Sequence, residues 1–137
     1  MWQTSKCLNC GTEVKYLPSR QTGKYCNNKC QSDHQHKVRI EQWLEGSSTP
    51  GVKTLRRHLT EQQEGCYTCG VTHWLDNPIT LELDHIDGNS LNNSPDNLRM
   101  LCPNCHSQTP TFKNKNKGNG RVARRERAKQ DYHRSRP

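Results

Sequence analysis

The chain has 137 residues, enough for one domain of ordinary size or for two very small ones. Only 28% of its residues are hydrophobic and its mean hydropathy is -1.18, which excludes a large apolar core. Small domains with so little apolar material usually rely on disulfides or bound metals for stability. No secretory signal and no apolar run of membrane-spanning length is visible, so we expect a cytoplasmic protein without membrane contact.

The positive charge is concentrated at the C-terminal end of the chain. Residues 1–112 contain 11 basic and 11 acidic side chains, whereas residues 113–137 contain ten basic and two acidic ones. This tail is expected to be disordered or to become helical on binding, and its basic residues predict contacts with nucleic-acid phosphates. A solubilising end is the alternative. The candidate phosphate contacts in the tail are Lys113, Lys115, Lys117, Arg121, Arg124 and Arg125.

Eight cysteines form four close pairs along the chain. A disulfide framework would require an oxidising compartment, for which the sequence gives no indication. The spacing within each pair instead suits two thiolates that hold one tetrahedral zinc ion together with a second pair. We therefore expect two structural zinc sites rather than disulfides. The pairs are Cys7 and Cys10, Cys26 and Cys30, Cys66 and Cys69, and Cys102 and Cys105.

Residues 5–31 form the first predicted module. Cys26 and Cys30 are one helical turn apart, so both sulfurs can lie on one face of a helix, which we expect to end near Gly46. The cysteine spacing resembles short treble-clef zinc fingers, which implies DNA binding, partner binding or a purely structural role. His34 or His36 is an alternative ligand in place of a cysteine.

Residues 47–51 have the composition of a linker, and the spacing of apolar residues predicts a helix over 52–63. Alternating apolar and polar residues predict a half-buried strand over 79–84, followed by a loop over 89–96. The sequence then predicts a return to regular structure at 97–101 and a short helix that opens at 102–106.

Asp84 and His85 are adjacent at the predicted end of the strand, so their side chains point in different directions. One of them could hold a cation while the other, a histidine, accepts a proton from a water molecule near neutral pH. An isolated Asp-His pair is weak support for hydrolysis. Its position between a cysteine pair upstream and Cys-x-x-Cys-His downstream makes the interpretation much stronger.

Residues 81–88 read Leu-Glu-Leu-Asp-His-Ile-Asp-Gly, and residues 97–109 read Asn-Leu-Arg-Met-Leu-Cys-Pro-Asn-Cys-His-Ser-Gln-Thr. In this order the two segments resemble the HNH endonucleases carried by bacteriophages, with the similarity extending over about residues 53–112. The resemblance implies a ββα-metal fold, hydrolysis of DNA to 5′-phosphate and 3′-hydroxyl ends, and, for a phage-encoded protein, the cytoplasm of the host cell.

The resemblance also implies a role for each matching residue. Asp84 and His106 would hold one catalytic divalent ion, Mg²⁺ or Mn²⁺, and His85 would act as the general base. Asn97 would brace the loop between the strands and orient His85. Arg99 is a candidate phosphate contact, with a salt bridge as the alternative. The second zinc would be held by Cys66, Cys69, Cys102 and Cys105.

We therefore expect an α+β protein in which a four-cysteine zinc finger with a helix, residues 1–46, precedes a small zinc-stabilised ββα-metal (HNH) domain, residues 47–112, and a basic tail, residues 113–137. The alternatives are a non-catalytic DNA-binding zinc protein and a nuclease accessory of a phage DNA-packaging complex. The sequence leaves open the protein partners, the oligomeric state and the DNA sequence preference.

Overall fold

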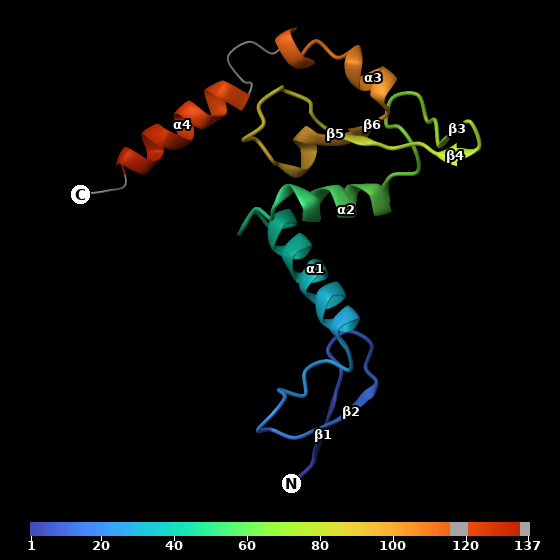
Figure 1. Cartoon of the computed structure of the whole chain (residues 1–137), viewed down its shortest axis with the longest axis vertical. Coiled ribbons are helices and arrows are strands. Elements are labelled where there is room, and N and C mark those ends of the chain that lie inside the picture. Colours follow the sequence, from blue (N-terminus) through green and yellow to red (C-terminus); the bar gives the residue numbers. More distant parts are fainter. Residues whose placement is uncertain (116–120, 135–137) are drawn as a thin grey trace. The chain divides into compact units, whose positions relative to one another are not determined.

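A computed structural model describes residues 1–115 and 121–134 of the chain (Figure 1). The chain divides into two compact units, Met1–Thr54 and Leu55–Pro137, and the boundary falls inside a helix. Mixed helices and short strands make up both units, as an α+β protein requires. No helix within the described ranges is long and apolar enough to cross a membrane.

The first unit begins with a β-hairpin that the cysteine pattern did not predict. Strands β1 (Gln3–Lys6) and β2 (Glu13–Tyr16) pair antiparallel, with Lys6 opposite Glu13. The turn between them carries the first cysteine pair, and the amide of Gly11 donates to the carbonyl of Cys7. Gly11 has φ +73°, a conformation that glycine adopts without steric cost.

The predicted first helix is present as α1 (Asn28–Leu44). Asn27 caps its N-terminus, because the side-chain oxygen accepts from the amide of Cys30. Ile40 and Trp43 are buried on this helix and belong to the core. The helix ends before Gly46, whose φ of +79° supplies the left-handed conformation typical of a helix C-terminus.

The predicted second helix is α2 (Val52–Gln62), on which Leu55 is completely buried. Just beyond its end, Gln63 binds the backbone of Met100 in both directions: its Nε2 donates to the carbonyl at 2.6 Å, and its Oε1 accepts from the amide at 3.1 Å. The amide of Tyr67 donates to the same carbonyl. These bonds satisfy backbone groups on Met100 that its neighbouring strand does not use.

A small hairpin, β3 (His73–Trp74) and β4 (Asn77–Pro78), follows the third pair of cysteines, Cys66 and Cys69. Its two turn residues, Leu75 and Asp76, have φ values of +47° and +64°. A type I′ hairpin turn needs positive φ at both central positions and usually contains Asn or Gly there, so Leu-Asp gives no turn signal in the sequence.

The predicted strand over 79–84 begins later than expected, as β5 (Glu82–His85). Ile79 and Leu81 instead pack against the small core formed by Cys66, Leu101 and Cys102. The apolar side chains at the start of the predicted strand are therefore partly buried against this core, and pairing with the next strand starts only at Glu82. The expectation was correct in type and wrong in its first residues.

The second half of the motif follows the expected order (Figure 1). A short 3₁₀ turn, η1 (Pro95–Asn97), leads into β6 (Leu98–Leu101), which pairs antiparallel with β5. Helix α3 (Pro103–Ser107) comes directly afterwards and packs on both strands. A two-stranded hairpin followed by a helix is the ββα arrangement that the resemblance implied.

The basic tail contains a 3₁₀ turn, η2 (Lys113–Lys115), and a helix, α4 (Arg121–Arg134). Lys117 lies outside the described residues, and Arg121 and Arg124 are described by their backbone alone. Of the two expectations for the tail, disorder or a helix, the structure has a helix over Arg121–Arg134.

Candidate functional site

Asp84 is a nearly buried carboxylate at the centre of the β5–β6 hairpin. Its side chain is 4% exposed, and its Oδ2 accepts from the Nε of Arg99 at 2.7 Å. The two residues are directly opposite each other in the strand register, so the pair spans the hairpin. Arg99 is therefore a salt-bridge partner of Asp84, which was the alternative to a phosphate contact.

The other carboxylate oxygen of Asp84 faces His106 on α3. The Nε2 of His106 lies 3.8 Å from Oδ1 of Asp84, although the two residues are 22 positions apart in the chain. Two ligand atoms at this separation, one on a buried carboxylate and one on an imidazole, can bind the same divalent ion. The structure thus brings together the two residues expected to hold the metal.

Two neighbours hold the ring of His106 in place. Its Nδ1 lies 2.6 Å from Oε2 of Glu82, and Phe112 packs edge-on against the ring with centroids 5.2 Å apart. A carboxylate can only accept, so Nδ1 carries a proton and Nε2 is the ring nitrogen that faces Asp84. Carboxylate–histidine pairs of this kind commonly orient imidazoles that bind metals.

His85 lies at the end of β5 and has a different neighbour from the one expected. Its Nε2 lies 2.8 Å from Oδ1 of Asn93, in the loop between the strands. Because an amide oxygen accepts and does not donate, Nε2 carries the proton. Nδ1 is left as the basic nitrogen, with no other hydrogen bond among the described residues.

Asn97 braces the loop, as expected, but through the backbone and Asp87 rather than through His85. Its Oδ1 accepts from the amide of Asp87 at 3.1 Å, and its Nδ2 donates to Oδ1 of Asp87 and to the carbonyl of Asn92. Its own carbonyl accepts from the amide of Ile86. Asn97 is 8% exposed, so these bonds are largely shielded from water.

Asp87 is the anionic centre of this loop. Its carboxylate accepts from the side chain of Asn92, from the amide of Asn89 and from Asn97. These hydrogen bonds, with the one from Asn92 contributing most, hold the pKa of Asp87 below its ordinary value of 3.8. The loop that carries Asn93 is therefore organised around a stable negative charge.

Four cysteines come together beside the core of the second unit. The sulfurs of Cys66, Cys69, Cys102 and Cys105 all lie within 4.8 Å of one another, with Cys69 and Cys102 3.8 Å apart. Tetrahedral zinc with bonds of about 2.3 Å separates its sulfurs by ~3.8 Å. All eight cysteines of the chain are free, and their spacing here fits a metal rather than a disulfide bond of about 2.05 Å.

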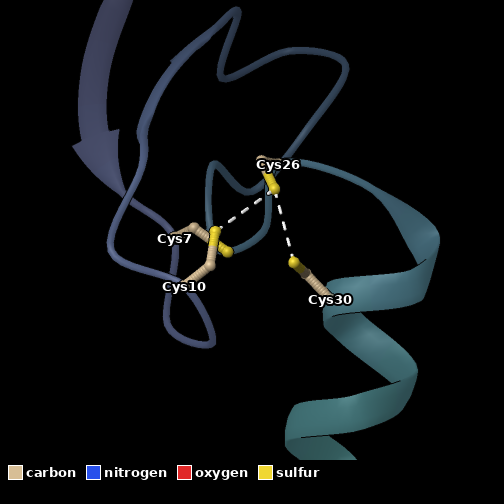
Figure 2. Close-up of side chains that lie close together, drawn as sticks. All are labelled: Cys7, Cys10, Cys26 and Cys30. Carbon is tan, nitrogen blue, oxygen red and sulfur yellow. Dashed lines mark hydrogen bonds between the residues drawn. The ribbon is translucent and has the colours of Figure 1, made fainter.

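The first unit contains a matching cluster, shown in Figure 2. Cys7 and Cys10 come from the hairpin turn, Cys26 from the end of a loop and Cys30 from the first turn of α1. Sulfur–sulfur distances are 3.6 Å from Cys10 to Cys26 and 3.5 Å from Cys26 to Cys30. His34 is bonded to Tyr25 at 3.0 Å, and the cluster contains four cysteines and no histidine.

The backbone around each cluster favours thiolates on the first cysteine. Hydrogen bonds from backbone amides, that of Cys10 foremost, lower the pKa of Cys7 to about 6. Burial raises the pKa of Cys66, but amides of Cys102, Cys69 and Thr68 outweigh burial and bring it to about 6. Neighbouring sulfurs have the reverse effect on Cys26 and Cys105, whose pKa values rise to about 12. Each site therefore has a thiolate ready for a metal and thiols that must lose protons on binding.

A cavity of about 420 Å³ opens next to the Asp84–Arg99 pair. Arg99 forms part of its wall and lies 5.9 Å from the centre of the Tyr67 ring. The rest of the lining comes from Thr68, Asn104, Cys105, Gln108, Thr109 and Pro110.

Of the candidate phosphate contacts in the tail, Lys113 and Lys115 lie close to other residues of the chain. The Nζ of Lys113 lies 5.0 Å from the centre of the Phe112 ring, and that of Lys115 lies 3.5 Å from the carbonyl of Ser107. Arg125 is exposed on α4. Lys115 therefore contacts α3, the helix that carries His106, and Lys113 lies beside Phe112, which packs on the ring of His106.

Glu82, Asn93 and Phe112 belong to the site although sequence reasoning did not assign them to it. Glu82 could have been found, because it precedes Asp84 by two residues and so shares its face of the strand. Asn93 and Phe112 carry no such signal in the sequence. Asn93 reaches His85 only because the loop between the strands folds back, and Phe112 reaches His106 only because the segment after α3 does.

Comparison with known proteins agrees with this geometry. Residues 66–110 match the model of the HNH endonuclease family. The H-N-H endonuclease F-TflIV of Escherichia phage T5 is 46% identical over 90 residues, which cover 64% of this chain and 40% of that protein. The chain thus spans about two fifths of the length of this relative. No solved structure matches the chain. Taken with the β5–β6–α3 arrangement, the match identifies residues 66–110 as an HNH endonuclease domain.

Proposed function

We propose that the protein is a metal-dependent endonuclease that hydrolyses phosphodiester bonds in DNA, with its centre at Asp84, His85 and His106. The observation that carries the proposal is the pairing of Asp84 Oδ1 with His106 Nε2 at 3.8 Å, with His106 fixed by Glu82. A buried carboxylate and an oriented imidazole form a partial ligand set, which leaves room for phosphate and water.

The donor atoms fit a divalent ion such as Mg²⁺ or Mn²⁺. Asp84 keeps one oxygen bonded to Arg99 and has the other available, while His106 offers Nε2. When bound, the ion would offset negative charge that develops on the scissile phosphate and on the departing oxygen. Before the ion binds, Arg99 balances the negative charge of Asp84 and holds its carboxylate in one orientation.

His85 is proposed as the general base. Asn93 holds the proton on Nε2, so Nδ1 is free to accept a proton from the attacking water. Asn97 and Asp87 shape the loop that presents Asn93, which makes Asn97 a positioning residue rather than a group that touches the reaction. The protonated imidazole would return its proton to solvent after the bond is cut.

Both cysteine clusters are proposed as structural zinc sites. Zinc at Cys66, Cys69, Cys102 and Cys105 would tie the residues before the hairpin to the start of α3, and thereby hold His106 near β5. Zinc in the cluster of the first unit would likewise tie the β1–β2 hairpin to α1; its ligands would be Cys7, Cys10, Cys26 and Cys30. Four thiolates saturate zinc, which keeps these sites chemically distinct from the one at Asp84.

The basic residues after Phe112 are proposed as contacts to DNA phosphates. Lys113, Lys115 and Arg125 lie in the described part of the tail, and Lys117, Arg121 and Arg124 extend the same run of charge. In this proposal the chain has three parts: a zinc finger at residues 1–46, a nuclease domain at residues 47–112 and a DNA-contacting segment at residues 113–137. Deletion of the chain after Phe112 should weaken DNA binding and reduce its salt dependence.

The proposal is tested by measuring plasmid cutting as Mg²⁺ or Mn²⁺ is added to the zinc-loaded protein. Wild-type protein should cut only with added metal, and His106→Ala should need a much higher metal concentration or lose cutting altogether. His73→Ala is the matched control, because His73 is exposed on β3 and its ring is hydrogen-bonded to the neighbouring Thr72. Equal metal dependence in His106→Ala and wild type would remove His106 from the ligand set.

A further inference from the structure

The first unit contains a second cavity, unrelated to the cutting centre, with a volume of about 470 Å³. Its lining comes from β2, the loop between β2 and α1, and the first turn of α1. Three cationic side chains, Lys15, Arg20 and Lys24, form part of this lining, and all three are exposed. Gln21, Tyr25 and Asn28 add polar groups to the same wall.

The distribution of charge singles out this cavity. Residues 1–31 contain five basic side chains and one acidic one. Lys6 lies opposite that acidic residue, Glu13, in the hairpin, and Lys29 is bonded to Asp33 at 2.6 Å. The three remaining cations line the cavity, and none of them has an acidic partner among the described residues. Unneutralised cations gathered around one hollow indicate an anionic ligand.

Lys15 lies on β2 itself, and the loop that presents Arg20 and Lys24 is fixed to the hairpin at two points. The side chain of Ser5 donates to the carbonyl of Gly23, and the amide of Leu8 donates to the carbonyl of Lys24 at 2.9 Å. Gly23 has φ +67°, and a Cβ there would collide with the ring of Tyr16, so the loop packs directly on β2. The cations are therefore carried on a pre-formed surface, which lowers the entropic cost of binding.

The neighbouring cysteine cluster reduces the positive charge without cancelling it. Cys26 belongs both to the cluster in Figure 2 and to the cavity wall. Four thiolates around one Zn²⁺ carry a net charge of minus two, against plus four for the side chains of residues 1–31. A net positive charge remains, and it is concentrated in the three cavity cations.

We infer that this cavity is a docking site for the phosphate backbone of DNA, separate from the cutting centre. The choice of DNA rests on the proposed function, because an anion site on the same chain as the nuclease domain would hold the polymer that the domain cuts. Two or three consecutive phosphates contacting Lys15, Arg20 and Lys24 would add affinity without reading bases. The zinc finger then contributes to holding the substrate as well as to stability.

The test is binding of a short fluorescent DNA duplex to the full-length, zinc-loaded protein without added Mg²⁺, at several salt concentrations. A triple variant, Lys15→Gln with Arg20→Gln and Lys24→Gln, removes the cavity charges. A matched triple variant, Lys6→Gln with Lys37→Gln and Arg39→Gln, removes the same charge from exposed positions of the same unit that do not line the cavity. Zinc content and circular dichroism verify that both variants are folded.

We expect the cavity variant to bind at least about tenfold more weakly, with the slope of log affinity against log salt reduced by about 0.9 for each phosphate that the protein no longer neutralises. The matched variant should change clearly less. Amide NMR shifts on adding the duplex should be largest over residues 20–28. Equal weakening of both variants, or shifts that avoid this loop, would overturn the inference.

These binding measurements, combined with the plasmid-cutting assay, separate this inference from the proposed function. Loss of binding in the cavity variant, combined with a wild-type protein that never cuts, would support the docking site and refute the nuclease. A wild-type protein that cuts DNA, together with a cavity variant that binds as the matched variant does, would leave the nuclease standing and remove the docking site.

Discussion

His106 and Glu82 form a hydrogen bond of 2.6 Å between Nδ1 and Oε2 that joins helix α3 to strand β5. This bond sets the direction in which Nε2 of His106 points, and therefore whether it faces Asp84. Partners of metal-binding imidazoles are worth about 10–100-fold in metal affinity. The role of Glu82 can be measured separately from that of His106 itself.

Glu82→Ala should weaken Mn²⁺ binding to the zinc-loaded protein by about 10–100-fold, because the imidazole is no longer held in one orientation. Glu82→Gln keeps an acceptor oxygen and should weaken it less. Isothermal titration with Mn²⁺ gives the affinities, and Glu64→Ala, an exposed glutamate near the end of α2, is the control. Unchanged affinity in Glu82→Ala would show that the bond has no part in metal binding.

Asn93→Ala should lower kcat with little change in KM, because His85 loses the group that keeps its proton on Nε2. Asn93→Asp keeps an acceptor and adds a negative charge, which favours the protonated imidazole. The acid limb of the pH–rate profile of Asn93→Asp should therefore lie at higher pH than that of wild type. Its kcat should lie between those of Asn93→Ala and wild type. If both variants have wild-type kcat and pH profile, Asn93 does not position His85.

Removal of Arg99 should destabilise the fold as well as the site. Arg99→Ala leaves the carboxylate of Asp84, 4% exposed, without its partner, and should cost about 1–3 kcal/mol of unfolding free energy. Arg57→Ala breaks an exposed pair with Glu61, whose side chains are 43% and 49% exposed, and should cost less than about 1 kcal/mol. Urea unfolding of the zinc-loaded variants compares the two, and similar losses would contradict a special role for the Asp84–Arg99 pair.

The loop around Asp87 should stay ordered through the mildly acidic range. Its pKa is lowered below 3.8 in the folded protein, so its contribution to stability is complete above 3.8 and is lost only as the pH falls further, through the folded pKa. The amide NMR signal of Asn89, which donates to this carboxylate, should therefore not move between pH 7 and about 5. Asn92→Ala removes the largest of the hydrogen bonds and should raise the pKa toward 3.8. A wild-type midpoint above 3.8 would contradict the structure.

Local patterns in the sequence were sufficient for the helices α1, α2 and α3. Cys26 and Cys30 share a helix face because they are four apart, and Gly46 ends that helix through its positive φ. The helix features depend on spacing along the chain, which a sequence displays directly. The joint role of Asp84 and His106 was implied by the resemblance to HNH endonucleases, and the structure places their side chains 3.8 Å apart.

Features that depend on chain segments meeting in space could not be predicted in the same way. The hairpin turn at Leu75 and Asp76 lacks a glycine or asparagine, and the early part of the expected strand packs on the Cys66 core instead of pairing. The bond from Asn93 to His85 requires the whole loop to fold back around Asp87. The sequence identified the chemistry of the site, whereas its supporting residues emerged only from the fold.

His85 is the proposed general base that generates the nucleophile for cutting DNA. The most direct test is single-turnover cutting of plasmid DNA by zinc-loaded wild-type protein and by His85→Ala, with saturating Mg²⁺ or Mn²⁺ and with His73→Ala as the matched control. We predict that wild type and His73→Ala cut at similar rates, and that His85→Ala binds DNA normally but is slower by a factor of about 100 or more. Equal cutting rates for His85→Ala and wild type would contradict the account.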